Sequence, residues 1–520
     1  MALLRFPLLH GTCRLLARTV AALTAAVLAA CASLPSPSPR TASFADDDVA
    51  DTTLARVVAA STPADAAGLS GFRLLADGGQ AWEARLALID HAERSVDAQT
   101  YSIADDASGR AFIGALRRAA ARGVRVRLLV DDLYAHESAA LLQALARQPG
   151  AEVRLFNPLP ARDGPLALRL LRSLHEFERI NRRMHNKLLL ADQRLAVTGG
   201  RNIGDAYFGA GDAFFIDLDL LAAGAAVQAL SGLFDRFWNS AASRPLAEVG
   251  LAAAAVPAGD APADAPAAAD PAPRSPGLRQ ALDEGRLALH WGRARLFADP
   301  PERASRGALP PDGDGALLGA VAALAQGDAE LFVVSPYFIP GDEGLARIAA
   351  ARARGLHVRV LTNSASATDE PLAHARYAGY RRRVVELGVE VYELSATLAG
   401  RRRGTAGASA SSHGRLHAKW AVVDRRRVLV GSMNLDPRSA LLNTELGLLI
   451  DSPALAHELL HGAPGQLLDD AWRVRPADSG GALVWQGVRD GHALVAEPGL
   501  DAGRWLWLSL LSLLIPEELL

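Results

Sequence analysis

Hydrophobic and polar positions follow two different periods along the first third of the chain. Apolar residues recur at helical spacing in 80–95 and in 109–122, and the second stretch ends at the helix-terminating Gly123. SVDAQTY (95–101) and VRVRLLVDD (124–132) are typical of strands, the second of them buried and with an acidic tip. This alternation of strands and helices predicts an α/β sandwich with a largely parallel sheet.

Two later segments show no periodic apolar face. Residues 251–277 are rich in Ala, Pro and Asp, and we interpret them as a disordered linker. Residues 400–414 (GRRRGTAGASASSHG) form a second low-complexity stretch, which we expect to be a mobile loop.

The chain contains an internal duplication. RRAAARGVRVRLLVDD parallels RIAAARARGLHVRVLTNS, and their glycines, Gly123 and Gly355, are 232 residues apart. The same offset relates five further pairs: His185 and His417, Lys187 and Lys419, Asp192 and Asp424, Gly199 and Gly431, Asn202 and Asn434. A constant offset over about 80 positions indicates tandem copies of one α/β unit. The expected first half spans 66–248, the linker 249–277, and the second half 278–520, which includes an apolar C-terminal segment.

One chemical motif occurs in both copies. The first reads MHNKLLLADQRLAVTGGRN and the second LHAKWAVVDRRRVLVGSMN, with the shared pattern His-x-Lys-x4-Asp-x6-Gly-(Gly/Ser)-x-Asn. Residues i and i+2 of a strand share a face, so the His and Lys of each copy point together. The Asp falls in the turn of a predicted hairpin, and the small residues after its second arm allow a substrate close to the backbone.

The two motifs resemble the paired His-Lys-Asp signature of the phospholipase D superfamily. The phrases NRRMHNKLLLAD, GGRNIGDAYF, FIDLDLLAAGAAV and GSMNLDPRSALLNTELGLLI are similar to those of bacterial cardiolipin synthases of the C type. The resemblance covers residues 70–245 and 280–520. It implies two duplicated α/β/α sandwich halves that face each other, with the active site at their interface.

This resemblance implies that two imidazoles carry the reaction. A neutral imidazole can attack phosphorus and form a covalent phosphohistidine, and a protonated imidazole can protonate the leaving alkoxide. By resemblance His185 is the nucleophile, and His417 is the general acid and then the base. The residues themselves do not distinguish the two histidines.

The resemblance also implies a cationic phosphate site. Lys187 and Lys419 would neutralise the phosphoryl oxygens as charge builds, and Asn202, Asn434 and the hydroxyl of Ser432 would donate hydrogen bonds to them. This arrangement replaces a metal ion, and the sequence has no compact His/Asp/Glu cluster that could bind one. We therefore expect catalysis without a metal or another cofactor.

Carboxylates are expected to orient the imidazoles through their second nitrogen. By resemblance Asp217 (IDLDLLA) and Glu445 (NTELGLLI) form this pair, with Asp219 as an alternative because the gap from Asn to acid is longer in the first half. Asp192 and Asp424 complete the family's catalytic motif. Their hairpin position favours a structural role in the turn, and direct catalytic contact is the alternative.

The N-terminus is typical of an exported lipoprotein. Residues 1–30 carry three Arg and no acid, include an apolar run too short for a membrane span, and end in Leu-Ala-Ala before Cys31. Leu-Ala-Ala-Cys resembles a bacterial lipobox, which implies a cleaved signal peptide, a lipidated Cys31 and a tether over 31–65. We expect a membrane-anchored lipoprotein that faces the periplasm; an uncleaved anchor with an incidental Cys is the alternative.

Composition excludes several other classes. Half of the chain is hydrophobic and 22% is charged, which rules out a disordered protein. The net charge of −2, or −5 after removal of the signal peptide, argues against a nucleic-acid partner. The only cysteines are Cys13 and Cys31, so the body of the chain has no disulfide scaffold and no thiolate-bound metal.

Two segments suit contact with a membrane surface. The C-terminal RWLWLSLLSLLIPEELL begins with two Trp, which favours an interfacial helix; a helix buried against the second half is the alternative. Residues 166–183 mix apolar and Arg positions at helical spacing. That pattern suits either a rim that touches anionic headgroups or a solvated amphipathic helix.

These features predict a cardiolipin synthase-type phosphatidyltransferase. The phosphatidyl group of a donor phospholipid would pass through a phosphohistidine to phosphatidylglycerol, with phosphatidylethanolamine or a second phosphatidylglycerol as the donor. The rival functions are hydrolysis of phospholipid to phosphatidic acid, a nuclease of the same superfamily, and a non-catalytic membrane lipoprotein. The sequence identifies no protein partner.

Overall fold

The computed structural model describes residues 33–45, 48–209, 213–251, 277–304, 315–396, 413–477, 481–500 and 502–519. The predicted signal peptide, Cys31, nearly all of the predicted linker and most of 400–414 lie outside these residues.

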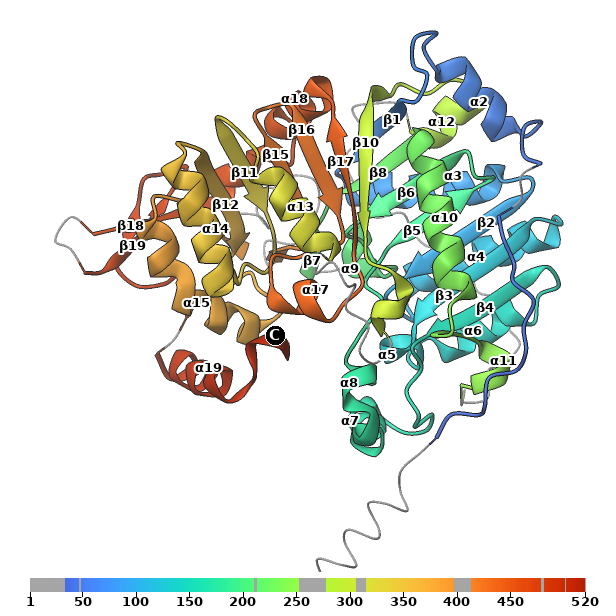
Figure 1. Cartoon of the computed structure of the whole chain (residues 1–520), viewed down its shortest axis with the longest axis horizontal. Helices are drawn as coiled ribbons and strands as arrows, with labels where there is room; N and C mark the ends of the chain where they lie inside the picture. Colours follow the sequence, from blue (N-terminus) through green and yellow to red (C-terminus); the bar gives the residue numbers. More distant parts are fainter. Residues whose placement is uncertain are drawn as a thin grey trace, which may run out of the picture.

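The first half is a mixed sheet with helices on both faces (Figure 1). Its strands lie in the order β1-β8-β6-β5-β2-β3-β4-β9. They are β1 (Ser70–Leu75), β2 (Ser95–Thr100), β3 (Arg125–Asp131), β4 (Ala151–Phe156), β5 (Leu188–Ala191), β6 (Leu195–Gly199), β8 (Asp219–Gly224) and β9 (Ser243–Pro245). The helices are α2 (Thr53–Ser61), α3 (Gly78–His91), α4 (Ala107–Ala121), α5 (Asp132–Ala135), α6 (Ala139–Ala146), α7 (Leu166–Arg172), η1 (Leu174–Glu176), α8 (Phe177–Ile180), α9 (Asp205–Phe208), α10 (Ala225–Asn239) and α11 (Leu246–Val249).

The second half repeats this plan in the order β10-β17-β16-β15-β11-β12-β13-β18-β19-β20. Its strands are β10 (His290–Ala298), β11 (Glu330–Val334), β12 (His357–Asn363), β13 (Glu390–Leu394), β15 (Trp420–Val423), β16 (Arg427–Gly431), β17 (Leu446–Asp451), β18 (Ala471–Pro476), β19 (Leu483–Gly487) and β20 (Ala493–Leu494). The helices are α12 (Leu278–Asp283), η2 (Pro301–Ala304), α13 (Ala316–Leu324), α14 (Gly341–Ala353), α15 (Pro371–Glu386), α17 (Pro437–Leu441), α18 (Pro453–His461), η3 (Gly465–Asp470), α19 (Ala502–Leu514) and η4 (Glu517–Leu519). The duplicated α/β fold predicted from the sequence is confirmed.

The prediction of a largely parallel sheet is wrong. Among the named strands that the structure describes within each half, β2-β3-β4 and β11-β12-β13 pair in parallel and the other strand pairs are antiparallel. The chemical motif itself is the reason. Each copy forms a hairpin, β5-β6 or β15-β16, and the next strand returns antiparallel beside it.

Several contacts among the described residues join the halves. Strands β1 and β10 pair antiparallel, which makes the two sheets continuous, with Ser70 opposite Gly292. A separate parallel pair links β7 (Ala213–Ile216) to β14 (His413–Leu416). Finally, one apolar cluster contains residues of both halves, among them Phe234 of α10 and Trp420 of β15. The halves therefore share a core in addition to their contact through backbone hydrogen bonds.

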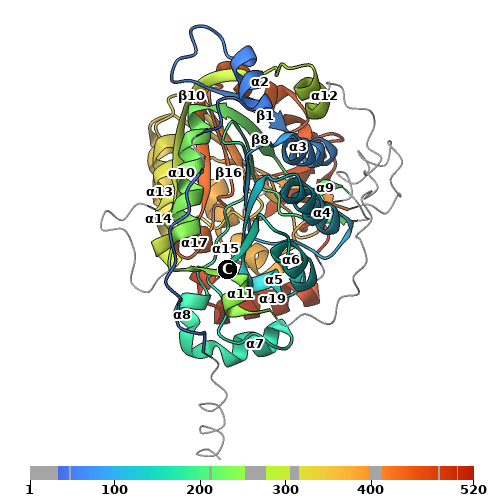
Figure 2. The same ribbon diagram turned by 90° about the vertical axis from the view of Figure 1, so that its right-hand side faces the viewer.

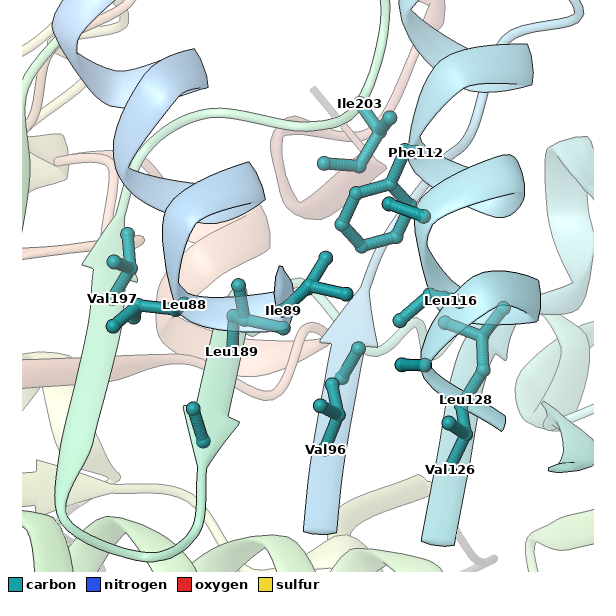
Figure 3. Close-up of a cluster of buried hydrophobic side chains, with 14 of the residues drawn as sticks. Leu88, Ile89, Val96, Phe112, Leu116, Val126, Leu128, Leu189, Val197 and Ile203 are labelled. Atoms are coloured by element: carbon teal, nitrogen blue, oxygen red, sulfur yellow. The ribbon is translucent and has the colours of Figure 1, made fainter. Parts of the chain in front are cut away.

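The outer face of the first sheet has its own core (Figure 3). Leu88 and Ile89 of α3 and Leu116 of α4 pack on Val96 of β2 and Val126 of β3. Burying each such side chain stabilises the fold by about 1.5–3 kcal/mol. In Figure 2 these helices lie on one side of the sheet and α10 lies on the other, which gives the layered arrangement.

The aspartates of the two motifs lie in the hairpin turns. Asp192 and Asp424 have φ of 46° and 52°. The carboxylate of Asp192 accepts the backbone N–H groups of residues 93–95, and that of Asp424 accepts those of 328–330. Each aspartate thus ties its turn to the loop that enters the first parallel strand of its half. This geometry favours the structural role over direct catalytic contact, because both carboxylates accept backbone hydrogen bonds away from the histidines.

Replacing Asp192 with Ala should lower the free energy of unfolding by about 3 kcal/mol, since three backbone N–H groups lose a fully buried acceptor. Asp424→Ala should cost about 1 kcal/mol, because that carboxylate is 24% exposed and water can replace it. Urea unfolding of the two variants would measure both values. Equal losses would contradict this account.

Candidate active site

Each motif histidine is held by backbone hydrogen bonds to the other half. The His185 N–H donates to the carbonyl of Thr444 at 3.0 Å, and the His417 N–H donates to the carbonyl of Ile216 at 2.8 Å. In both cases the accepting residue directly precedes a carboxylate that sequence analysis singled out. The backbone therefore places each carboxylate beside the histidine of the opposite half.

Glu445 pairs with His185. Both of its carboxylate oxygens lie 3.0 Å from Nδ1 of His185, and Glu445 is fully buried. The hydroxyls of Ser432 and Ser439 donate to the same carboxylate. The hydroxyl of Ser432 thus holds Glu445 in this structure, and its predicted contact with phosphate, which would require a change of partner, stays a prediction. Ser439 was not predicted as a site residue, although it lies within GSMNLDPRSALLNTELGLLI.

Asp217 pairs with His417 in the same way. Its Oδ2 lies 2.6 Å from Nδ1 of His417. The alternative, Asp219, forms ion pairs with Arg85 at 2.9 Å and Arg201 at 3.3 Å. Asp217 is thus the carboxylate that contacts the imidazole of His417. Asp219 forms ion pairs with two buried arginines instead.

The glycine of the first motif makes room for Asp217. A Cβ on Gly200 would lie 2.1 Å from Oδ1 of Asp217, so any larger residue would displace the carboxylate. The second motif has Ser432 at this place, and its side chain reaches the longer Glu445 through a hydrogen bond. The Gly/Ser difference between the motifs therefore matches the Asp/Glu difference between their partners.

The two lysines lie beside the histidines and are buried. Lys187 Nζ donates to the His185 carbonyl at 2.7 Å, and Lys419 Nζ lies 2.9 Å from Nδ1 of His417. Burial lowers the pKa of Lys187 to about 7 and lowers that of Lys419. Both ammonium groups lack full solvation, so an anionic phosphate would be a strongly favourable partner for them.

Burial also keeps the imidazoles neutral. It lowers the pKa of His185 to about 4, although the Glu445 carboxylate acts in the opposite direction. Burial and the adjacent Lys419 lower the pKa of His417, which Asp217 partly offsets. A neutral imidazole whose Nδ1–H donates to a carboxylate keeps a lone pair on Nε2, and that nitrogen can attack an electrophile.

The motif asparagines are buried and retain unused hydrogen-bonding capacity. Asn202 donates to the hydroxyl of Tyr207 at 2.9 Å. Among the described residues, Oδ1 of Asn202 and Oδ1 of Asn434 are buried without a hydrogen-bond partner. The ring of Tyr207 lies edge-on to His417 at 5.3 Å, and that of Tyr101 lies edge-on to His185 at 5.4 Å. Neither tyrosine was predicted from the sequence, although Tyr207 lies within the phrase GGRNIGDAYF.

The sequence matches the family described as "Cardiolipin synthase, PLD-like domain" over residues 86–238 and 321–461, which is more than half of the chain. The chain belongs to this family of the phospholipase D superfamily. Cardiolipin synthase C of Escherichia coli (strain K12) is 37% identical over 468 residues, which cover 85% of this chain and 94% of that protein. Cardiolipin synthase A of Pseudomonas putida (strain GB-1) is 27% identical over 81% of this chain and 71% of that protein. The prediction of a phosphatidyltransferase of this superfamily is thereby confirmed.

The fold of this cardiolipin synthase family member also occurs in a solved structure. Phosphatidylserine synthase of Haemophilus influenzae Rd KW20 superposes with a TM-score of 0.56 over 88% of this chain and 96% of that one, at 14% identity. In the part of the chain that the structure describes, no helix is both long and apolar enough to cross a membrane.

The low pKa of His185 can be tested by NMR titration of the free protein with labelled histidine, assigned by His185→Ala. The ring should titrate near pH 4 rather than 6.5. Glu445→Gln should lower this pKa further, because it removes the carboxylate that favours the imidazolium. Catalysis that needs the neutral ring should therefore persist to about pH 5 and be lost as pH falls through 4. Titration near 6.5 would contradict the effect of burial.

Proposed function

We propose that this enzyme makes cardiolipin by transferring a phosphatidyl group, through a phosphohistidine on His185, to phosphatidylglycerol. The observation that carries the proposal is the pair of buried imidazoles, each held by a carboxylate of the opposite half, with two lysines beside them. Such a site can hold one phosphodiester between two imidazoles. The resemblance to cardiolipin synthases supplies the lipid class.

In the first step Nε2 of His185 attacks phosphorus, and the bond to the headgroup oxygen breaks. The leaving alkoxide takes a proton from the imidazolium of His417. The bound phosphodiester supplies the negative charge that raises the pKa of His417 and so stabilises this imidazolium. Lys187 and Lys419 neutralise the non-bridging oxygens as charge builds on them.

In the second step a hydroxyl of phosphatidylglycerol attacks the phosphohistidine. Neutral His417 accepts the hydroxyl proton, the bond between phosphorus and Nε2 breaks, and both histidines return to their starting states. The donor in this scheme is a second phosphatidylglycerol or phosphatidylethanolamine. Glu445 and Asp217 keep Nδ1 of each ring protonated through both steps.

Purified protein supplied with vesicles of phosphatidylglycerol, radiolabelled in the phosphatidyl group, should form cardiolipin. His185→Ala and His417→Ala should each reduce the rate by on the order of 10³-fold or more, whereas His461→Ala, on the exposed face of α18, should not. With the label in the phosphate, protein quenched in denaturant during turnover should carry label on His185 as an acid-labile adduct, and His185→Ala should carry none. Phosphatidic acid without cardiolipin would identify a hydrolase, and label on another residue would overturn the assignment of the nucleophile.

We also propose that the protein is a lipoprotein anchored through Cys31 and works at a membrane surface, facing the periplasm. Exposed apolar side chains in two separate regions support work at a membrane surface. Leu171 of α7 is 63% exposed, and Trp507 and Leu510 of α19 are 62% and 51% exposed. Figures 1 and 2 place α7, α8 and α19 at the same end of the molecule.

The predicted helix over 166–183 is divided into α7, η1 and α8, and Arg169 points inward to Asp132.

Trp507→Glu and Leu171→Glu should each lower cardiolipin formation on long-chain vesicles about tenfold, because each removes apolar contact with the bilayer. Activity on micelles of short-chain phosphatidylglycerol should be retained. Val488→Glu, the same change at an exposed apolar residue after β19, is the matched control. An equal loss on vesicles and micelles would mean that the end with α7 and α19 does not act through the membrane.

A further inference from the structure

A cavity of about 520 Å³ lies in the second half, between α13, α14 and α17. Its inner wall is apolar and includes Leu324 of α13, Ile348 of α14, and Val333 and Val360 of the sheet. Helices α3 and α4, which occupy the corresponding places in the first half, pack against each other. The duplication therefore provides an internal comparison for the cavity.

In the first half, aromatic side chains fill the corresponding space. The rings of Trp82 of α3 and Phe208 of α9 pack with their centroids 4.8 Å apart. Phe112 of α4 points into the core near Ile203 (Figure 3). All three aromatic residues are buried.

Backbone hydrogen bonds fix how the two halves correspond here. Ala104 N–H donates to the carbonyl of Ile203 in the first half, and Ile339 N–H donates to that of Leu435 in the second. Residues of α3 and β2, which precede this contact, therefore correspond to residues 235 positions later in the second half. Residues of α4 and α9 correspond to residues 232 positions later, as in the two motifs.

At these offsets each aromatic residue has a smaller counterpart, and all three counterparts line the cavity. The pairs are Trp82 and Leu317, Phe112 and Gly344, Phe208 and Ala440. The second half therefore has smaller side chains on three different elements, all at the position of the cavity. These smaller side chains leave open a space that aromatic rings fill in the first half, while the sheet and helices around it have the same arrangement in both halves.

The mouth of the cavity combines charged groups with an exposed apolar residue. Glu343 and Arg347 of α14 lie there, and the hydroxyl of Tyr380 donates to Glu517 of η4 at 2.7 Å. Leu441 of α17 lines the cavity and is 40% exposed. Helix η4 follows directly after α19, whose exposed apolar residues are described above. The mouth thus lies next to the surface proposed to face the membrane.

The cavity also adjoins the candidate active site. Leu435 and Asp436, which directly follow Asn434 of the motif, form part of its wall. The same wall continues into α17, where the hydroxyl of Ser439 donates to Glu445. Burial raises the pKa of Asp436 to about 7, and its carboxyl accepts the N–H of Ser439. The group is therefore partly protonated near neutral pH, so an apolar ligand beside it costs less than it would beside a full negative charge.

We propose that this cavity binds one acyl chain of the phospholipid substrate or product, an inference that rests on the proposed function. A cavity of this size is in the range of ligand sites, and an apolar cavity excludes water and takes up apolar ligands. An acyl chain in the cavity lies against Leu435, which directly follows Asn434, and against α17, whose Ser439 donates to Glu445. Its neighbours at the mouth are Leu441 of α17 and Glu517 of η4.

Ala440→Phe should fill the cavity in the way that Phe208 fills the first half. Val321→Phe on α13, farther from the motif, is a second filling variant, and Ala146→Phe at an exposed position of α6 is the matched control. The full-length protein would be irradiated in vesicles of phosphatidylglycerol with a diazirine near the end of one acyl chain, and the labelled peptides identified. Thermal denaturation would verify that each variant folds.

We expect label on peptides of α13 and α14 in the unchanged protein and in Ala146→Phe, and at least a tenfold loss of it in both filling variants. These two variants should also lower kcat/KM for dipalmitoyl phosphatidylglycerol about tenfold and leave that for the dihexanoyl lipid unchanged. Label that persists after filling, or lies elsewhere, would overturn the proposal. Labelling needs no turnover, so a protein that labels α13 and α14 but forms no cardiolipin would disprove the proposed function and leave the acyl site standing.

Discussion

The arrangement of this protein depends on two buried hydrogen bonds between a carboxylate and an imidazole, each of which crosses between its halves. Glu445 and Asp217 are at most 3% exposed, and each has as its partner an imidazole from the opposite copy. A buried carboxylate without a partner costs several kcal/mol, so neither half can complete its own site alone. The continuous sheet through β1 and β10, the β7-β14 pair and the shared apolar core all hold the halves in the one position where both pairs form.

Duplication produced two similar halves, and small changes then made them different. Gly200 leaves space for Asp217, whereas Ser432 supports the longer Glu445. Glu445 receives two serine hydroxyls, while the ring paired with Asp217 has Lys419 close to its Nδ1. The two imidazoles therefore differ electrostatically, although the motifs that contain them are nearly identical. This asymmetry is the physical basis on which one histidine can act as nucleophile and the other as acid.

The sequence predicted those features that local spacing determines. The period of two in His-x-Lys placed both side chains on one face, and the repeated Asp and Gly positions predicted the two hairpins and the duplicated fold. It gave the wrong sheet direction, because each hairpin adds antiparallel neighbours to a short parallel centre. The contact of Ser432 with Glu445 was not predicted, since Glu445 lies 13 residues away and is brought near by the β16-β17 pairing. Tyr101 and Tyr207 approach the imidazoles through tertiary packing, which no motif encodes.

The electrostatics of the free site suggest how one pair of histidines could serve two opposite purposes. Burial lowers the pKa of both imidazoles, so both are neutral at physiological pH and either could attack phosphorus. A general acid must instead carry a proton, and the neighbouring lysine opposes this at His417. An incoming phosphodiester changes the balance, because its negative charge offsets both lysines and favours an imidazolium beside it. In the proposed mechanism the acid form of His417 is therefore created by the substrate, and the empty site has little capacity to protonate any leaving group.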